Sequence, residues 1–374
     1  MKDIFYMQKA LDLAIKGKGA TSPNPMVGTV IVKDGKIIGK GYHQKYGEKH
    51  AEIMAIDNAQ MSVAGATLYC NLEPCTADIP HKKTPPCSQR IVKEKIQRVV
   101  IATLDPNPYV NGRGVAYLRQ HNIQVDTGIL EQESIALNEK YFTFIQLGRP
   151  FIHLKIAQSL DGRIATSKGR SKWITNENAL KKVHQLRSSY DAILVGINTV
   201  LQDDPSLDVR LWPGKNPCRI ILDNELKIPS DARILSHSDP AKTFIFTFKS
   251  LVDKKAKQLV GRGIQVVSLP SNGQPYLDLH EVLSFLGKNN ISSVLVEGGG
   301  EVFTSFIKNR LFDKISFFIA PMMIGSGIQS IGDLGIDSLE EAFRLKNVKI
   351  EIIDQQALVE GYRDNGKTDL RKGP

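Results

Sequence analysis

The chain has 374 residues, a formal net charge of +10, and a composition that is 41% hydrophobic and 24% charged. A chain of this length holds two ordinary domains, each with its own core, and the composition excludes a disordered or low-complexity protein. Before residue 151 there are 19 Lys and Arg against 14 Asp and Glu, and from there on 30 against 25. Because the positive charge is spread evenly, we expect a solvated, lysine-rich surface; anionic small substrates are the alternative use of this charge, and nucleic acid is not expected as a partner.

The sequence contains no segment typical of a membrane span or a signal peptide. Its first segment has apolar residues at helical spacing, broken by Lys9, Asp12 and Lys16, which is typical of an amphipathic surface helix. The longest apolar run, 315–324, is too short to cross a bilayer. We therefore expect a cytoplasmic protein that contacts no membrane. In that compartment disulfides are rare, and clustered cysteines more often bind metal.

The first half alternates strand-like and helix-like segments. Asp34-Gly35 between two strand-like segments predicts a β-hairpin. The pattern then predicts a helix over 50–60, a strand over 66–72, a helix over 88–95, a strand over 98–104, a short helix near 114–121 and a last helix from about 131. Gly148-Arg149-Pro150 interrupts it, since glycine and proline resist helix continuation. A first domain is therefore predicted over residues 1–147.

The second half restarts with a strand-like segment at residue 151 and continues with further short β-rich runs separated by helical segments. Such an alternation predicts an α/β sheet with helices on its faces. We expect a second domain over 151–363 and a loose polar tail over 364–374. The sequence contains no G-x-G-x-x-G, so a Rossmann dinucleotide site is not predicted.

Cysteine and histidine residues of the first half have the composition of a hydrolytic zinc site. Such a site takes three protein ligands and leaves the fourth position for water, and His50, Cys75 and Cys87 supply one nitrogen and two thiolates. Glu52 can carry protons between the activated water and a leaving ammonia. Since residues i and i+2 do not share a helix face, the site must lie off the N-terminal end of the helix.

The other two cysteines have a simpler interpretation. Cys70 lies within a strand-like run and Cys218 lies at the start of another. A lone cysteine in such a position usually behaves as a small apolar side chain. We therefore expect both to pack in domain cores.

The motif order points to a class of enzyme. His-x-Glu followed by Pro-Cys is the signature of zinc-dependent nucleobase deaminases, and His50-Ala51-Glu52 and Pro74-Cys75 match it. Eleven residues separate Cys75 from Cys87, where the signature has two. Three alternatives stay open: a small-molecule deaminase, a deaminase acting on a base in RNA, and a non-catalytic zinc-stabilised regulatory protein.

The first half resembles the deaminase domain of the bifunctional riboflavin-biosynthesis deaminase/reductase family, whose second motif ends in Thr-Pro-Pro-Cys after a longer loop. The matching stretches are Thr84-Pro85-Pro86-Cys87, Ser22-Pro23-Asn24-Pro25, Gly41-Tyr42-His43 and Asp105-Pro106-Asn107-Pro108. The cysteine loop is three residues longer than is usual in the family, with Lys82 where the family has glycine. The resemblance implies that the substrate is held by Asn24, His43, Lys83, Asp105 and Asn107.

The second half resembles the reductase domain of the same family over four stretches, 155–163, 171–175, 183–210 and 296–301. That domain is similar in fold to dihydrofolate reductase and uses NADPH. Independently, the strand-like segment 293–296 leads into Gly298-Gly299-Gly300 and a helix-like segment over 302–307. Glycines at such a turn let backbone N–H groups and a helix N-terminus approach a phosphate.

The resemblance also implies which residues of the second half have a function. The NADPH site would be lined by Ala157, Trp173, Thr199, Asp203, Gly299, Gly300, Glu301, Val302, Phe303, Thr304 and Ser305. The sugar phosphate would be held by Ser171, Arg187, Leu207, Arg210 and Glu297, and the two guanidinium groups among them suit phosphate oxygens. Surface ion pairs are the alternative role for these arginines. Lys155 is expected as a cation near the carbon that accepts hydride.

Together these features predict an α/β protein with a cytidine-deaminase-like α/β/α domain followed by a dihydrofolate-reductase-like α/β domain. The resemblance implies a zinc-dependent hydrolytic deamination of 2,5-diamino-6-ribosylamino-4(3H)-pyrimidinone 5′-phosphate. An NADPH-dependent reduction of the ribosyl group would follow, giving 5-amino-6-(5-phosphoribitylamino)uracil. Expected partners are phosphorylated pyrimidines and further copies of the chain in a homo-oligomer. A deaminase acting on RNA and a protein with only the reductase active are the alternatives.

Overall fold

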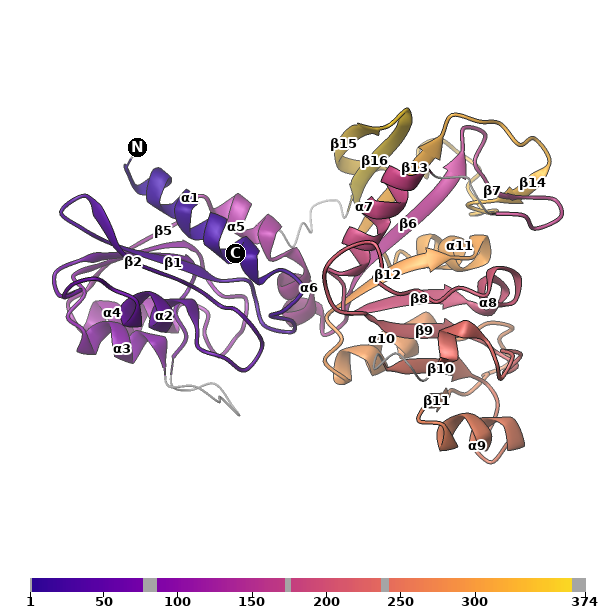
Figure 1. The fold of residues 1–374 in the computed structure, drawn as a ribbon, viewed down its shortest axis with the longest axis horizontal. Coiled ribbons are helices and arrows are strands. Elements are labelled where there is room, and N and C mark those ends of the chain that lie inside the picture. The colour runs from indigo at the N-terminus through magenta and orange to yellow at the C-terminus, as the bar shows by residue number, and fades with distance from the viewer. Residues whose placement is uncertain (1, 77–85, 172–175, 237–241, 365–374) are drawn as a thin grey trace. The chain divides into compact units, whose positions relative to one another are not determined.

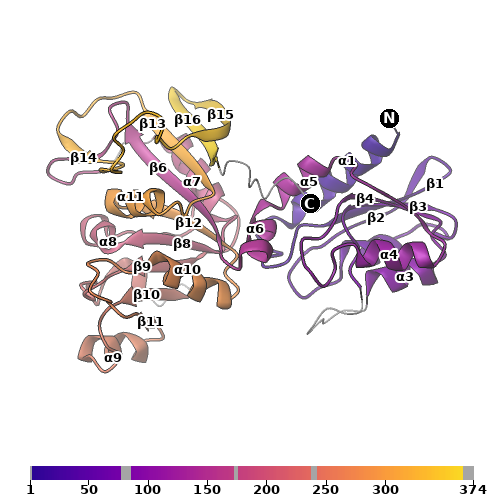
Figure 2. The same cartoon turned by 180° about the vertical axis from the view of Figure 1, so that it is seen from behind.

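The computed structural model describes residues 2–76, 86–171, 176–236 and 242–364. The chain divides into two compact units, one that ends at Gly148 and one that begins at Arg149 (Figure 1). Each unit has one large sheet with helices on both faces, as the two opposite views make clear (Figure 2). Over the described ranges, no helix is long and apolar enough to cross a membrane.

The first unit contains six α-helices and five strands among its described residues. They are α1 (Lys2–Ala14), β1 (Gly28–Lys33), β2 (Lys36–Tyr42), α2 (Ala51–Asp57), β3 (Thr67–Leu72), α3 (Cys87–Lys93), β4 (Arg98–Thr103), α4 (Arg113–Gln120), β5 (Gln124–Thr127), α5 (Glu131–Leu137) and α6 (Glu139–Leu147). A short 3₁₀ turn (Ile15–Gly17) follows α1.

The sheet of the first unit has the strand order β2-β1-β3-β4-β5. Strands β1 and β2 form the predicted antiparallel hairpin, and both Asp34 and Gly35 at its turn have positive φ, as a type I′ turn requires. Strands β3, β4 and β5 run parallel to one another. Their carboxyl ends therefore meet at one edge of the sheet, where α/β proteins bind ligands.

Two apolar layers hold the helices of the first unit on its sheet. Helices α2, α3 and α4 bury Ile56, Ile91 and Leu118 against one face, and α1 buries Met7 and Ala10 against the other. Cys70 lies on the first of these faces and is fully buried, so the expectation that it packs in the core is confirmed. The layers make the sheet a rigid support for the loops at its edge.

A close approach between β2 and α2 sets the position of the helix that begins after His50. A Cβ atom added to Gly41 would lie 2.4 Å from the carbonyl oxygen of Ala51 and 2.4 Å from the backbone nitrogen of Ala55. Only glycine lets the two backbones pack at this distance. Gly41 therefore helps to determine where the N-terminus of α2 lies.

The second unit begins with the long strand β6 and ends with a hairpin. Its elements are β6 (Phe151–Ser159), β7 (Arg163–Thr166), α7 (Glu177–Arg187), β8 (Ala192–Gly196), α8 (Ile197–Asp203), β9 (Cys218–Leu222), β10 (Thr243–Thr247), α9 (Lys254–Gly261), β11 (Gln265–Ser268), α10 (Leu279–Lys288), β12 (Ser293–Gly298), α11 (Gly300–Lys308), β13 (Lys314–Ala320), β14 (Gly327–Gln329), β15 (Leu345–Ile353) and β16 (Gln356–Arg363).

Nine strands form the main sheet of the second unit, in the order β11-β10-β9-β8-β12-β6-β13-β16-β15. The strands from β11 to β13 are parallel to their neighbours, whereas β15 and β16 form an antiparallel hairpin at one edge. Helices α10 and α11 pack against one face, and α8 and α9 against the other. Cys218 packs partly buried against the first of these cores.

We predict that Gly41→Ala displaces α2 and lowers the free energy of unfolding of the first unit. The added methyl group meets backbone atoms that cannot turn aside, which costs roughly 1–3 kcal/mol. Gly261→Ala is the matched control, because no atom lies within 4 Å of the added Cβ there and alanine favours the helix. Urea unfolding of both variants is the measurement, and equal midpoints would contradict the close-approach argument.

Candidate functional site

The first site lies at the edge of the first sheet, where three segments bring together His50, Cys75 and Cys87. His50 is the residue before α2, Cys75 lies in the loop after β3, and Cys87 begins α3. Nδ1 of His50 is 3.4 Å from Sγ of Cys75 and 3.3 Å from Sγ of Cys87, and the three potential ligand atoms all lie within 4.8 Å of one another. One nitrogen and two sulfurs at these distances fit a zinc ion.

Glu52 lies in the first turn of α2, and its carboxyl group interacts with His50, Cys75 and Cys87. The cluster itself lies off the N-terminal end of the helix, as the spacing of His50 and Glu52 predicts. Glu52 is 3% exposed, and its Oε2 atom has no hydrogen-bond partner among the residues that the structure describes. Burial raises the pKa of the carboxyl group above its usual value. A buried carboxyl oxygen without a partner is costly, so this atom is available to a bound water or substrate.

Two of the expected substrate residues meet on another side of the cluster. His43 is 3% exposed, and its ring lies edge-on to His50 with centroids 5.5 Å apart. Its Nδ1 atom is 3.1 Å from the carbonyl oxygen of Lys49, and its Nε2 atom is 3.2 Å from Nδ2 of Asn24. The first contact requires a proton on Nδ1, so Nε2 accepts from the Asn24 amide. Burial lowers the pKa of His43, which favours this neutral form.

Asp105 and Asn107 follow the carboxyl end of β4 in a tight turn. Asp105 is 6% exposed, and burial raises the pKa of its carboxyl group to about 7. Its Oδ1 atom accepts the backbone N–H of Asn107 at 2.9 Å. The side chain of Asn107 accepts the N–H of Tyr109 at 3.0 Å, which is the turn chemistry that asparagine favours. Lys83, the fifth expected residue, lies outside the described residues.

Glu73 is a structural carboxylate that the sequence analysis missed. It is 3% exposed and accepts backbone N–H groups of Asp105, Gly112 and Val115 at 3.3, 3.0 and 3.1 Å. It therefore ties the loop after β4 to the strand end that precedes Cys75. Its position next to Pro74-Cys75 is the one sequence signal that could have singled it out.

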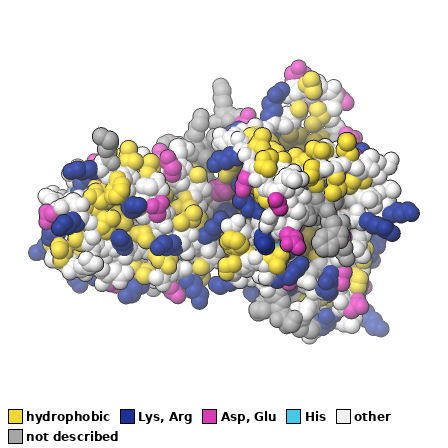
Figure 3. Space-filling view, turned by 45° about the horizontal axis from the view of Figure 1, so that its top comes forward, with side chains coloured by type: hydrophobic (Ala, Val, Ile, Leu, Met, Phe, Trp, Pro, Cys, Tyr) yellow, Lys and Arg dark blue, Asp and Glu magenta, His cyan; other side chains and the backbone are white. Residues whose placement is uncertain are grey.

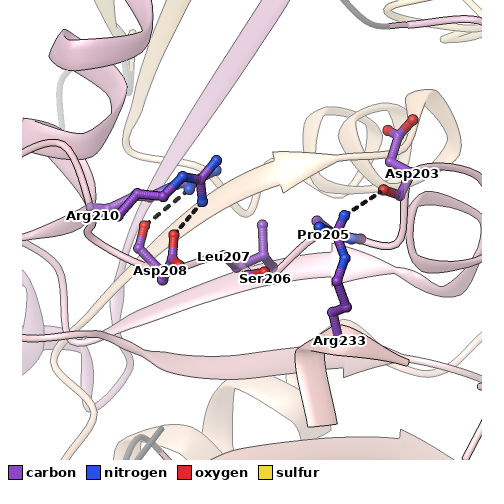
Figure 4. A pocket seen from close by; sticks show the side chains of 8 residues that line it. Asp203, Pro205, Ser206, Leu207, Asp208, Arg210 and Arg233 are labelled. Carbon is purple, nitrogen blue, oxygen red and sulfur yellow. Dashed lines mark hydrogen bonds and ion pairs between the residues drawn. The ribbon is translucent and has the colours of Figure 1, made fainter. Parts of the chain in front are cut away.

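The second unit has a pocket of about 440 Å³ lined by the last residues of α7 and α8, by the segment between α8 and β9, and by Arg233. Its lining includes Arg187, Leu207 and Arg210, three of the five residues expected to hold a sugar phosphate. Figure 4 shows Arg210 beside Asp208, with which it forms an ion pair, and Arg233 beside Asp203. Ser171 donates a hydrogen bond to Asp203 at 2.7 Å. The pocket is therefore polar and carries three guanidinium groups.

A buried ion pair lies behind this pocket. The guanidinium of Arg187 donates to both oxygens of Glu297, at 2.6 and 2.9 Å, and the ammonium of Lys155 lies 3.8 Å from the same carboxylate. Although burial opposes ionisation, Arg187 holds the pKa of Glu297 below its usual value. Burial lowers the pKa of Lys155, against the attraction of Glu297. The pair of Arg187 is thus internal rather than a surface contact.

The glycine turn after β12 leads directly into the N-terminus of α11. Gly299 has a φ of 91°, a backbone conformation that residues other than glycine rarely adopt. Strand β8 is parallel to β12 and leads into α8, which carries Thr199 and Asp203. The orphan N–H groups at the start of α11 fit a phosphate of a dinucleotide.

The remaining residues expected at the NADPH site differ in their surroundings. Thr304 donates to the carbonyl oxygen of Gly300 at 2.6 Å and accepts the N–H of Gly332 at 2.7 Å. The side chain of Phe303 packs in the core at 3% exposure, and Ala157 packs beside α7. Trp173 lies outside the described residues.

The geometry defines a class: a unit with a zinc-type cluster beside a buried glutamate, followed by an α/β unit with a glycine turn at a helix N-terminus. Residues 1–103 match the cytidine and deoxycytidylate deaminase zinc-binding region, and residues 150–359 match the RibD C-terminal domain. The chain is 47% identical to the riboflavin biosynthesis protein RibD of Aquifex aeolicus, over 95% of this chain and 96% of that protein.

Solved structures agree with these matches. A diaminohydroxyphosphoribosylaminopyrimidine deaminase/5-amino-6-(5-phosphoribosylamino)uracil reductase from Thermotoga maritima superposes with a TM-score of 0.83 at 38% identity, covering 97% of this chain and 99% of that one. RibD of Acinetobacter baumannii superposes with a TM-score of 0.88 at 33% identity, with the same coverage. The chain belongs to the family of bifunctional riboflavin-biosynthesis deaminase/reductases.

Family membership decides between the alternatives that the motifs left open. The chain is a bifunctional enzyme of riboflavin biosynthesis with a deaminase and a reductase unit. The predicted fold class is confirmed: a cytidine-deaminase-like domain precedes a reductase domain of the dihydrofolate-reductase type. A deaminase specific for RNA or a purely regulatory zinc protein is not what these relatives indicate.

We predict that the purified chain binds about one zinc ion and that Cys87→Ser lowers the zinc affinity more than about 100-fold, since loss of a ligand costs more than loss of a supporting group. Cys218→Ser is the control, because that cysteine lies in the other unit. Zinc content by mass spectrometry and chelator titration checks both variants. Full zinc retention in Cys87→Ser would remove this residue from the ligand set.

Proposed function

We propose that the first domain, residues 1–147, hydrolyses the 2-amino group of 2,5-diamino-6-ribosylamino-4(3H)-pyrimidinone 5′-phosphate. The observation that carries this proposal is the unpartnered, buried Glu52 oxygen beside the His50, Cys75 and Cys87 cluster. The names of the relatives supply the substrate class. In the reaction a water oxygen bonds to C2 of the pyrimidine, the bond from C2 to the amino nitrogen breaks, and ammonia leaves.

His50, Cys75 and Cys87 would hold the zinc ion, which lowers the pKa of a coordinated water when bound. Glu52 takes a proton from the attacking water and returns it to the departing nitrogen. Its raised pKa suits both halves of this transfer. Asn24, His43, Asp105 and Asn107 bind and orient the pyrimidine and its ribose phosphate, and Lys83 completes this set.

We propose that the second domain, residues 151–363, reduces the ribosyl group of the deaminated product to ribityl. NADPH supplies the hydride when bound. Its site is formed by Ala157, Trp173, Thr199, Asp203 and residues 299–305, and the start of α11 supports this choice through its N–H groups. We propose NADPH because the family that this chain resembles uses it. The name of the Thermotoga maritima relative gives a reductase activity.

The pocket in front of the buried ion pair suits the sugar phosphate of the reductase substrate. Arg187 and Arg210 line it, and their planar guanidinium groups bind phosphate oxygens in pairs. Ser171, Leu207 and Glu297 complete the proposed contacts. Lys155 contributes a cation beside the carbon that accepts hydride, held there by Glu297 at 3.8 Å.

We predict that Glu52→Gln separates the two activities. The wild-type, zinc-replete enzyme should oxidise NADPH when given either the diamino substrate or its deaminated product. Glu52→Gln should keep its zinc and its full rate with the deaminated product, but release ammonia from the diamino substrate about 10²–10⁴-fold more slowly, because the proton carrier is gone. NADPH absorbance and ammonia assays measure the two steps.

Three results of this experiment would contradict the proposal in different ways. Unchanged ammonia release by Glu52→Gln would remove Glu52 from the mechanism. Wild-type turnover of the deaminated product alone would mean that the deaminase has another substrate or none. Reduction with NADH at the same kcat/KM as with NADPH would contradict the proposed preference for NADPH.

We also propose that the chain forms a homo-oligomer through β15. This strand is one of the two edge strands of the sheet, and its Val348, Ile350 and Ile352 residues are 50%, 70% and 69% exposed. An antiparallel pair of two copies centred on Ile350 would set Val348 opposite Ile352, and Lys349 opposite Glu351. Figure 3 shows hydrophobic side chains on the visible faces of both units, and exposed apolar side chains that lie together mark interaction surfaces.

We predict that Ile350→Lys converts the oligomer to a monomer, because it sets two like charges opposite each other at the centre of the proposed pair. Val252→Lys is the control, since Val252 is 73% exposed but lies away from β15 in the chain. Light scattering after size exclusion measures the mass. A monomeric wild type, or an oligomer that survives Ile350→Lys, would contradict the proposal.

A further inference from the structure

Asn138, which lies between helices α5 and α6, and Tyr141 of α6 form hydrogen bonds to the two loops that carry the proposed pyrimidine contacts. Asn138, 2% exposed between the helices, donates from Nδ2 to the carbonyl oxygen of Met26 at 2.9 Å and accepts the N–H of Met26 at 2.7 Å. Asn138 is the N-cap residue of α6, yet its side chain makes no capping hydrogen bond. It is used instead to hold the segment that follows Asn24 and Pro25.

One helical turn further along α6, Tyr141 holds the second loop. Its hydroxyl group donates to Oδ1 of Asp105 at 2.9 Å, the same oxygen that accepts the N–H of Asn107. In the part of the chain that the structure describes, Oδ2 of Asp105 makes no hydrogen bond with another residue. Tyr141 therefore occupies one oxygen of the carboxylate and leaves the other available to a ligand.

A small apolar cluster seats the two helices at this position. Ile135 of α5 and Phe142 of α6 pack with Leu72, the last residue of β3, and Val27 and Tyr141 pack against them. The cluster joins the carboxyl end of β3 to the residue before β1. This packing holds α5 and α6 against the end of β3 and against the residue before β1.

Neither helix belongs to the region that defines the deaminase class, since the match to the zinc-binding region ends at residue 103. The zinc cluster is complete without them, because its residues come from segments before α4. The paired amide of Asn138 and the hydroxyl of Tyr141 add polar, oriented contacts to the substrate loops.

We propose that Tyr141 and Asn138 are positioning residues of the deaminase: they hold Asp105 and the Asn24 segment at the spacing that the pyrimidine requires, and they act on substrate binding rather than on chemistry. This inference rests on the proposed roles of Asn24 and Asp105 in binding the substrate. Zinc binding and proton transfer by Glu52 do not depend on either residue. Their loss therefore raises KM and leaves kcat intact.

The test compares Tyr141→Phe with wild type in the full-length, zinc-replete enzyme, using ammonia release from the diamino substrate. Removing one hydrogen bond to a carboxylate that binds substrate should raise KM about tenfold, with kcat within about twofold of wild type. Asn138→Asp keeps the acceptor for the N–H of Met26 and loses the donor to its carbonyl oxygen, and should also raise KM. Zinc content and turnover of the deaminated product should stay unchanged.

Tyr117→Phe is the matched control, since Tyr117 lies on α4 and its hydroxyl makes none of the side-chain hydrogen bonds of the described residues. An unchanged KM in Tyr141→Phe would overturn the inference. A joint loss of zinc, kcat and reductase turnover would also overturn it, because it would reveal a structural role alone. Absence of ammonia release in both wild type and Tyr117→Phe would instead contradict the proposed deaminase function. The inference would then be overturned with it.

Discussion

Parallel strands end at the same edge of a sheet, and both candidate sites depend on this constraint. In the first unit the edge brings Cys75 beyond β3 next to Asp105 beyond β4. In the second unit it brings α8 and the glycine turn before α11 together at the ends of β8 and β12. Loops at such an edge are free to differ in sequence, while the strands beneath them keep their ends in register.

Buried carboxylates fix the positions of the groups around them at this edge of each sheet. A carboxylate removed from water must be partnered, at a cost of several kcal/mol if it is not. Glu73 is satisfied by three backbone N–H groups, two from the loop after β4 and one from α4, whereas Glu297 is satisfied by the fork of Arg187 and the ammonium of Lys155. The first arrangement fixes a backbone, and the second fixes cations beside a pocket. In both cases the carboxylate is buried, so its partners must keep the positions in which they satisfy it.

The features that sequence predicted are those with a short repeat or a local motif. The hairpin at Asp34-Gly35, the strands β3 and β4 and the helix α11 follow from periodicity and turn chemistry. Strand β5 is four residues long, and β15 carries apolar residues on an exposed edge, so neither has the pattern of a buried strand. Glu73 and Tyr141 gain their roles from partners 32 or more residues away, and a single sequence holds no record of such contacts.

The lengthened loop between Cys75 and Cys87 shows why the zinc motif tolerates a change in spacing. The backbone N–H of Ser88 donates to the carbonyl oxygen of Cys75 at 3.2 Å, so the two ligand positions are joined directly. Cys75 is further held by the strand end that Glu73 anchors, and Cys87 by the start of α3. Lengthening a loop whose ends are already fixed costs only a few tenths of a kcal/mol for three residues. The ligand geometry therefore depends on the residues that flank the loop, and its length is free to vary.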